Sequence, residues 1–162
     1  MPPLSELGRP LHEGAPLAAD VPDEPLGEEG RAALDERVAV ETGAVILAVE
    51  RGQDEDFDRL DVLVERMWAA NAFEDYRRAD VRFHIGVAEA AHSASLVTAM
   101  TEVQGRMSDL IACIAHPEEV LTRSNAQHRR LVRLLRARDA AAAVVLIREH
   151  IEGTEHILAG LM

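Results

Sequence analysis

The segment Glu74–Ala91, which reads EDYRRADVRFHIGVAEAA, decides the fold class of this chain. Its apolar residues recur at intervals of three and four, which predicts an amphipathic helix with one inward face. Asp80 and His84 lie on that face one helical turn apart, where a polar side chain needs a partner. The inward face predicted for this helix consists of Phe73, Tyr76, Asp80, Phe83, His84, Val87 and Ala91.

Helical periodicity continues on both sides of this segment. A first helix is expected from about Arg31 to Arg51, with Gly52 as its stop, and Asp54 is expected to cap the next helix. Ser93 and Asp139 are natural caps for two later helices. No segment alternates between apolar and polar residues as a half-buried strand would. The sequence therefore predicts an all-α fold, an antiparallel bundle of six to seven helices.

The beginning of the chain differs from the rest. Residues 1–30 are rich in proline and acidic residues and show no period, so we expect a flexible arm there. Residues 31–162 are then expected to form one helical domain, which is long enough to bury a sizeable core.

Composition narrows the class of protein. The chain of 162 residues is 48% hydrophobic but only 3% aromatic, which favours a core of small aliphatic side chains between close-packed helices. Its formal net charge of -12 repels phosphate backbones, so this chain is a poor direct binder of nucleic acid. Cys113 is the only cysteine, so no intramolecular disulfide can form. This cysteine count and the lack of a long apolar run predict a cytoplasmic protein.

Two further histidines, His128 and His150, fall on the apolar faces of two later helices. Taken singly, each is readily explained as a hydrogen-bonded core residue, and Asp80 with His84 as a surface ion pair. Taken together, four buried polar side chains without partners would cost roughly 1–3 kcal/mol each, whereas one divalent cation could satisfy all four. Imidazole and carboxylate donors suit Zn, Ni, Co, Fe or Mn better than Mg or Ca. A tetrahedral site would be closed and structural, and an octahedral site would leave two open positions.

The residues also resemble a known family. Asp80–His84, followed by Ala88–Leu96, is similar to the D-x-x-F-H and A-x-A-x-x-N-x-x-L motifs of the FCD domain, although Ser93 stands where the family usually has Asn. This is the C-terminal effector domain of GntR-family transcription regulators of the FadR type. Arg37–Glu41 is similar to the R-x-x-x-E of its first helix, and Asn125–His128 with the later His150 is similar to its last two helices.

The resemblance implies a helical bundle that binds a small effector, commonly a carboxylate, beside a divalent metal. The family's metal ligands correspond to Asp80, His84, His128 and His150, and zinc is the first expectation for the metal. Arg37 is expected either to bind the effector carboxylate or to form a salt bridge with Glu41. For Asn125 the alternatives are a hydrogen bond to the effector or a metal-bound water, or a packing role. The remaining histidines, among them His116 and His156, are expected to have no function.

We therefore expect a ligand-sensing domain that forms a homodimer. The residues before the bundle are too few for the winged-helix module that reads DNA in a full regulator, so DNA binding is expected only through a module absent from this chain. The alternatives are a metal-dependent enzyme on a helical bundle and a stand-alone structural or dimerisation domain. The sequence shows no nucleophile motif, no phosphate-binding loop and no general base on the predicted metal stripe, so no catalytic residue and no enzymatic activity are expected.

Overall fold

The computed structural model describes residues 26–112 and 114–160 and contains six helices and no strand within them. The helices are α1 (Gly27–Arg51), α2 (Asp54–Ala69), α3 (Phe73–Ala90), α4 (Ala94–Ile111), α5 (Glu118–Arg136) and α6 (Ala140–Leu158). The predicted all-α bundle is confirmed. Helix α1 begins at Gly27, a few residues before the expected start, and most of the predicted arm lies outside the described residues.

Polar caps set several helix ends. The Ser93 hydroxyl accepts the N–H of Leu96, and the Asp139 carboxylate accepts the N–H of Ala142, as the sequence predicts. The prediction that Asp54 caps α2 is wrong. The cap residue is Gln53, because its N–H donates to the Asp56 carboxylate at 2.9 Å and thereby closes the first turn one residue earlier.

Gly52 ends α1 for a reason of space. Its backbone is extended, with φ of −61°, so left-handed geometry is not what selects glycine here. A Cβ at this position would lie 2.6 Å from a ring carbon of Phe57 and 2.6 Å from the carbonyl oxygen of Ala48. Glycine therefore allows the α1–α2 connection to close tightly over the Phe57 ring.

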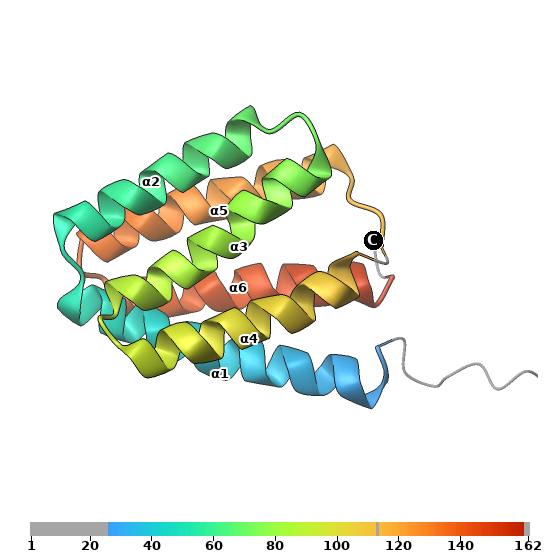
Figure 1. Cartoon of the computed structure of the whole chain (residues 1–162), viewed down its shortest axis with the longest axis horizontal. Helices are drawn as coiled ribbons and strands as arrows, with labels where there is room; N and C mark the ends of the chain where they lie inside the picture. The colour runs from blue at the N-terminus through green and yellow to red at the C-terminus, as the bar shows by residue number, and fades with distance from the viewer. Residues whose placement is uncertain (1–25, 113, 161–162) are drawn as a thin grey trace, which may run out of the picture.

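The helices lie side by side in a bundle (Figure 1), and α1, α3, α5 and α6 each carry buried polar residues. Helix α1 packs against α3, α4 and α6, while α3 also packs against α2, and α5 packs against α2 and α6. The core is mainly aliphatic, as the composition predicts, with Phe57 and Phe83 fully buried. Because α3, α5 and α6 turn their inward faces toward this interior, polar residues on those faces are brought together.

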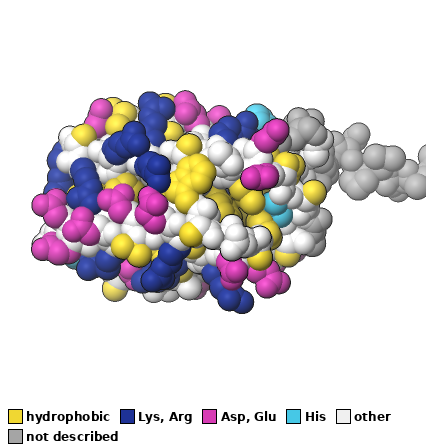
Figure 2. All heavy atoms as spheres, turned by 90° about the horizontal axis from the view of Figure 1, so that it is seen from above, with side chains coloured by type: hydrophobic (Ala, Val, Ile, Leu, Met, Phe, Trp, Pro, Cys, Tyr) yellow, Lys and Arg dark blue, Asp and Glu magenta, His cyan; other side chains and the backbone are white. Residues whose placement is uncertain are grey.

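Arginines of α5 and the following turn tie the bundle to its neighbours. Arg136 contacts Asp58 and Asp61 of α2 at 2.6 and 2.8 Å. Arg138 donates to the carbonyl oxygens of Val49 and Gly52 at the end of α1, both at 2.7 Å. Figure 2 shows basic and acidic side chains interspersed on the face that it presents, with hydrophobic side chains between them. Arg136 and Arg138 therefore serve helix packing.

Within the described residues, no helix has the length and apolar character needed to cross a membrane.

Candidate metal centre and adjoining cavity

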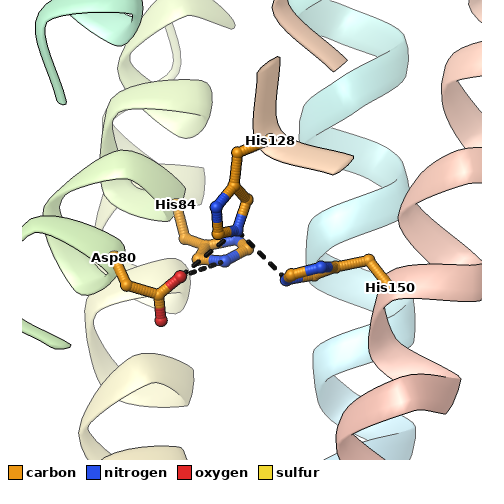
Figure 3. A group of neighbouring side chains, drawn as sticks. All are labelled: Asp80, His84, His128 and His150. Atoms are coloured by element: carbon orange, nitrogen blue, oxygen red, sulfur yellow. Dashed lines mark hydrogen bonds and ion pairs between the residues drawn. The ribbon is translucent and has the colours of Figure 1, made fainter. Parts of the chain in front are cut away.

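The four predicted ligands meet in the interior of the bundle (Figure 3). Asp80 and His84 come from α3, His128 from α5 and His150 from α6, and all four are buried. One ligand atom from each lies within 4.8 Å of all the others. The Nε2 atom of His128 is 3.2 Å from Asp80 Oδ1 and 3.3 Å from His150 Nε2, and His84 Nε2 is 3.4 Å from the same carboxylate oxygen.

The opposite nitrogen of each imidazole faces a side-chain oxygen. Nδ1 of His84 lies 2.8 Å from Glu41 Oε2. Nδ1 of His128 lies 3.4 Å from the Asn125 oxygen, and Nδ1 of His150 lies 3.1 Å from the Gln127 oxygen. A carboxylate oxygen and an amide oxygen only accept hydrogen bonds, so these contacts favour the tautomers with the proton on Nδ1, which a metal bound at Nε2 requires. The lone pairs of all three Nε2 atoms then point into one space.

This arrangement fits a metal ion. Nε2 of His84 has only the long contact of 3.4 Å with Asp80 Oδ1 and no hydrogen bond of good geometry within the described part of the chain. With the protons on Nδ1, the 3.3 Å contact between His128 Nε2 and His150 Nε2 holds two lone pairs and no proton. A divalent cation among these atoms would bind both, together with the Asp80 carboxylate. Histidines whose outer nitrogen donates to a carboxylate or an amide oxygen are typical of metal sites, because that bond fixes the tautomer and the ring.

The electrostatics favour the protonation state that a metal requires at Asp80, His128 and His150. Burial lowers the pKa of His128 to about 3, and burial together with neighbouring positive charge holds the pKa of His150 well below its usual range. Burial opposes ionisation of Asp80, but the hydrogen bond with His84 and the charges of His84 and Arg77 outweigh it and hold the pKa of Asp80 well below its usual range. His128 and His150 are therefore neutral and Asp80 is ionised at neutral pH. Burial opposes the charged form of His84, but the charges of Glu41 and Asp80 and their hydrogen bonds outweigh it and raise the pKa of His84, so a metal bound at its Nε2 would displace a proton.

A charged network supports His84 from behind. Glu41 is 1% exposed, and besides His84 it accepts hydrogen bonds from Arg37 Nε at 2.7 Å and Gln104 Nε2 at 2.9 Å. Burial opposes the charged form of Glu41, but the charges of His84 and Arg37 hold the pKa of the carboxyl well below its usual range. The Arg37–Glu41 pair was visible in the sequence. The contribution of Gln104 was not, because it lies 63 residues from Glu41.

A cavity of about 280 Å³ adjoins the ligands. Arg37, Asp80 and His150 lie in its lining, and Nη1 of Arg37 is buried without a hydrogen-bond partner. The alternative of a salt bridge between Arg37 and Glu41 is confirmed, and contact of Arg37 with an effector stays a prediction. Asn125 does not line this cavity; its Nδ2 donates to the carbonyl of Val64 at 3.3 Å, which leaves its oxygen for His128.

Two histidines without an expected function also line the cavity. His116 stacks on Phe73 with ring centroids 3.8 Å apart and an interplanar angle of 7°, and His156 lies on the last turns of α6. The sequence carries no signal for His116, because its position depends on how the α4–α5 connection folds back toward α3.

Comparison with known proteins identifies the family. The model of the FCD domain matches residues 32–153. The chain belongs to the FCD domain family. The resemblance drawn from the motifs is therefore confirmed over most of the helical part.

Two relatives place this FCD domain among longer proteins. The chain is 33% identical over 122 residues to a protein of Mycobacterium gastri named as an HTH-type transcriptional regulator, RmpR. The match covers 72% of this chain and 43% of that protein, so the chain spans less than half the length of this relative. The solved structure of E. coli McbR/YncC is similar with a TM-score of 0.71 at 21% identity, over 85% of this chain and 71% of that one. That second likeness supports the fold.

Proposed function

We propose that this FCD domain is the ligand-sensing part of a transcriptional regulator and binds both a divalent metal and a small carboxylate. The observation that carries the proposal is the convergence of four buried ligand atoms, which lie within 4.8 Å of one another. Nδ1 of each histidine faces an oxygen of Glu41, Asn125 or Gln127, which favours the tautomer whose Nε2 lone pair points into the shared space. The metal would be held by Asp80, His84, His128 and His150, with zinc first and nickel, cobalt, iron or manganese as alternatives.

The bound metal would supply a fixed positive charge at the inner end of the cavity. The chain adds Arg37, which lines the same cavity and whose Nη1 has no hydrogen-bond partner within the described residues, so its guanidinium suits a carboxylate. Glu41 holds this guanidinium by its Nε, so its orientation is set before any ligand arrives. Asn125 and Gln127 fix the rings of His128 and His150, which favours a positioning role for Asn125 over direct contact with the effector.

Binding at this place can be transmitted because four helices meet there. The ligands come from α3, α5 and α6, and Arg37 comes from α1. A carboxylate that binds one arrangement of these helices more tightly than another shifts the population toward it. In a longer cytoplasmic regulator, formed as a homodimer, that shift would alter the spacing of two DNA-binding modules. The Mycobacterium gastri relative is named as an HTH-type transcriptional regulator, which supports the proposal that this domain works within a longer DNA-binding regulator.

The test combines elemental analysis of the purified protein with thermal unfolding. We expect about one divalent transition metal per chain, and we expect chelator to lower the midpoint of unfolding. A metal present at a thousandfold excess over its Kd stabilises the fold by about 4 kcal/mol. Carboxylates should raise the midpoint further, and only when the metal is present.

Two variants and one control make the test specific. His128→Ala and His150→Ala should each lose metal and the response to carboxylates. His92→Ala is the control, because His92 is a largely exposed histidine that contacts Asp56 instead of the cluster. If both cluster variants bind zinc and carboxylates as the wild type does, the proposed function is wrong.

A further inference from the structure

We infer that Arg77 is a positioning residue of the metal centre, which holds Asp80 as a one-oxygen ligand and ties this ligand to α4. The inference rests on the metal site of the proposed function and adds to it a residue outside the four ligands and their imidazole partners. It concerns how many positions of a bound metal remain open to an effector.

The two carboxylate oxygens of Asp80 face different groups (Figure 3). Oδ1 lies 3.2 Å from His128 Nε2 and 3.4 Å from His84 Nε2, on the side where the imidazole nitrogens converge. Oδ2 accepts a hydrogen bond from Arg77 Nη1. The side chains of Arg77 and Asp80 are only 12% and 9% exposed, so little water competes for this ion pair. A cation among the Nε2 atoms would therefore meet Asp80 through Oδ1.

This division of the two oxygens matters for coordination. A carboxylate can bind a metal through one oxygen or through both, and a guanidinium that occupies the second oxygen favours the first mode. Asp80 then supplies one donor atom, as do His84, His128 and His150. An octahedral metal with four protein donors keeps two positions open. If Asp80 bound through both oxygens, it would take one of the two positions from the effector.

The guanidinium of Arg77 is itself held from α4. Its Nη2 donates to Ser108 Oγ at 3.2 Å and lies 3.5 Å from Gln104 Oε1. The Ser108 hydroxyl donates its own proton to the backbone carbonyl of Gln104 at 2.9 Å, so a lone pair of Oγ is left for the guanidinium. Gln104 also donates to Glu41 at 2.9 Å. None of the four candidate ligands comes from α4, yet α4 contacts the groups that hold two of them in place.

The chemistry of arginine suits this role. Its planar guanidinium offers two terminal nitrogens in a fixed fork, so Arg77 can bind Asp80 with one and α4 with the other. The alternative is that Arg77 only balances the charge of Asp80. The two roles predict opposite effects on zinc binding when the guanidinium is removed. Loss of a positive charge near the cation strengthens zinc binding, whereas loss of a partner that orients a ligand weakens it.

The zinc affinity of Arg77→Met distinguishes the two roles. Measured against a competing chromogenic chelator at neutral pH, the zinc Kd should rise by about tenfold. This is the low end of the effect of outer partners of metal ligands, about 10–100-fold, because the lost charge opposes it. Arg78→Met is the matched control and should leave the Kd unchanged, since the Arg78 side chain is 79% exposed and contacts Asp75 at 3.7 Å.

Cobalt gives a spectroscopic readout that a general loss of stability would not move. The visible d–d bands of Co(II) depend on the number and geometry of its ligands. The bands of cobalt-loaded Arg77→Met should differ from those of the wild type, because Asp80 would bind with both oxygens or leave the metal. The bands of the Arg78→Met protein should match those of the wild type.

Ser108→Ala tests the link to α4. Its zinc Kd should rise by less than that of Arg77→Met, because Arg77 keeps its bond to Asp80. The double variant should bind zinc as Arg77→Met does, since Ser108 acts through Arg77. A crystal structure of the zinc-loaded wild type keeps the inference testable if the variants do not fold. It should show Asp80 Oδ1 at about 2.0–2.2 Å from the zinc and Oδ2 on Arg77.

The outcomes separate this inference from the proposed function. Zinc bound through both oxygens of Asp80 would overturn the inference. An Arg77→Met protein whose zinc Kd does not rise, or whose cobalt bands match those of the wild type, would also overturn it. Losses of Ser108→Ala and Arg77→Met that add in the double variant would refute the link to α4. The proposed function would survive each of these results. If the wild type binds neither zinc nor cobalt, both fail.

Discussion

Replacement of Glu41 by Gln tests whether the network behind His84 builds the metal centre. Glu41 contacts His84 Nδ1 at 2.8 Å, Arg37 Nε at 2.7 Å and Gln104 Nε2 at 2.9 Å, and it is 1% exposed. Gln has nearly the same shape but no charge, so the variant removes the anion that holds the Nδ1 proton of His84. Removing an outer hydrogen-bond partner of a metal ligand weakens metal binding by about 10–100-fold, or about 1.4–2.8 kcal/mol.

The same substitution has a cost that does not depend on metal. It leaves the buried guanidinium of Arg37 without its counter-charge, and breaking a buried ion pair in this way costs about 3–5 kcal/mol of folding stability. We therefore expect two separate losses in Glu41→Gln. The midpoint of urea unfolding of the metal-free protein should fall, and the zinc Kd measured against a competing chromogenic chelator should rise.

Glu36→Gln is the matched control for both measurements. Glu36 lies on the same helix and pairs with Arg106 at the surface, so its neutralisation should change stability by less than about 1 kcal/mol and leave zinc affinity unchanged. A Glu41→Gln protein that unfolds more easily but binds zinc as tightly as the wild type would refute the positioning argument. In that case the carboxylate would be only the counter-ion of Arg37.

Three further substitutions probe the scaffold. Gly86→Ala would place a Cβ 2.8 Å from Leu60 Cδ2 in the core, and overpacking of about 1–3 kcal/mol should exceed the gain in helix propensity of about 1 kcal/mol. A Cβ at Gly105 would lie in open space, so Gly105→Ala should instead stabilise the protein. The free energies of urea unfolding distinguish the Gly86→Ala and Gly105→Ala proteins. Asp56→Asn should cost about 0.5–2 kcal/mol at about pH 7, because it weakens the cap at Gln53. Burial opposes the charge of Asp56, but the hydrogen bonds from Gln53 and His92 outweigh it and lower the pKa of Asp56. The stabilisation by the Asp56 charge is therefore fully present above the pKa of an unfolded Asp, about 3.9, and is lost as the pH falls through the pKa in the folded protein.

Each scaffold prediction has a result that would contradict it. A Gly86→Ala protein more stable than the wild type would mean that Leu60 moves aside at no cost. For Asp56→Asn, the gap in unfolding free energy to the wild type should close as the pH drops below about 4. A gap that persists in acid would show that the charge of Asp56 is not what stabilises the cap.

Local chemistry made much of this protein predictable. The spacing of Asp80 and His84 placed both on one face of a helix, because residues four apart lie on the same side at 3.6 residues per turn. Ser93 and Asp139 marked helix starts through bonds that reach only three residues. The cap at Asp54 was misplaced because Asp56, two residues further on, competes for the same turn and wins by accepting the N–H of Gln53.

The sequence by itself determined the helices, their inward faces and the residue types at the metal site, since these follow from contacts within about four positions. Tertiary structure decided which atoms meet. Glu41 and Gln104 join behind His84, and His116 reaches the cavity wall over Phe73, only because α1, α3 and α4 pack side by side. Such contacts join residues dozens of positions apart and leave no periodic trace. The contacts of His84 with Glu41 and of His150 with Gln127, which support a metal at the Nε2 atoms, therefore appear only in the folded chain.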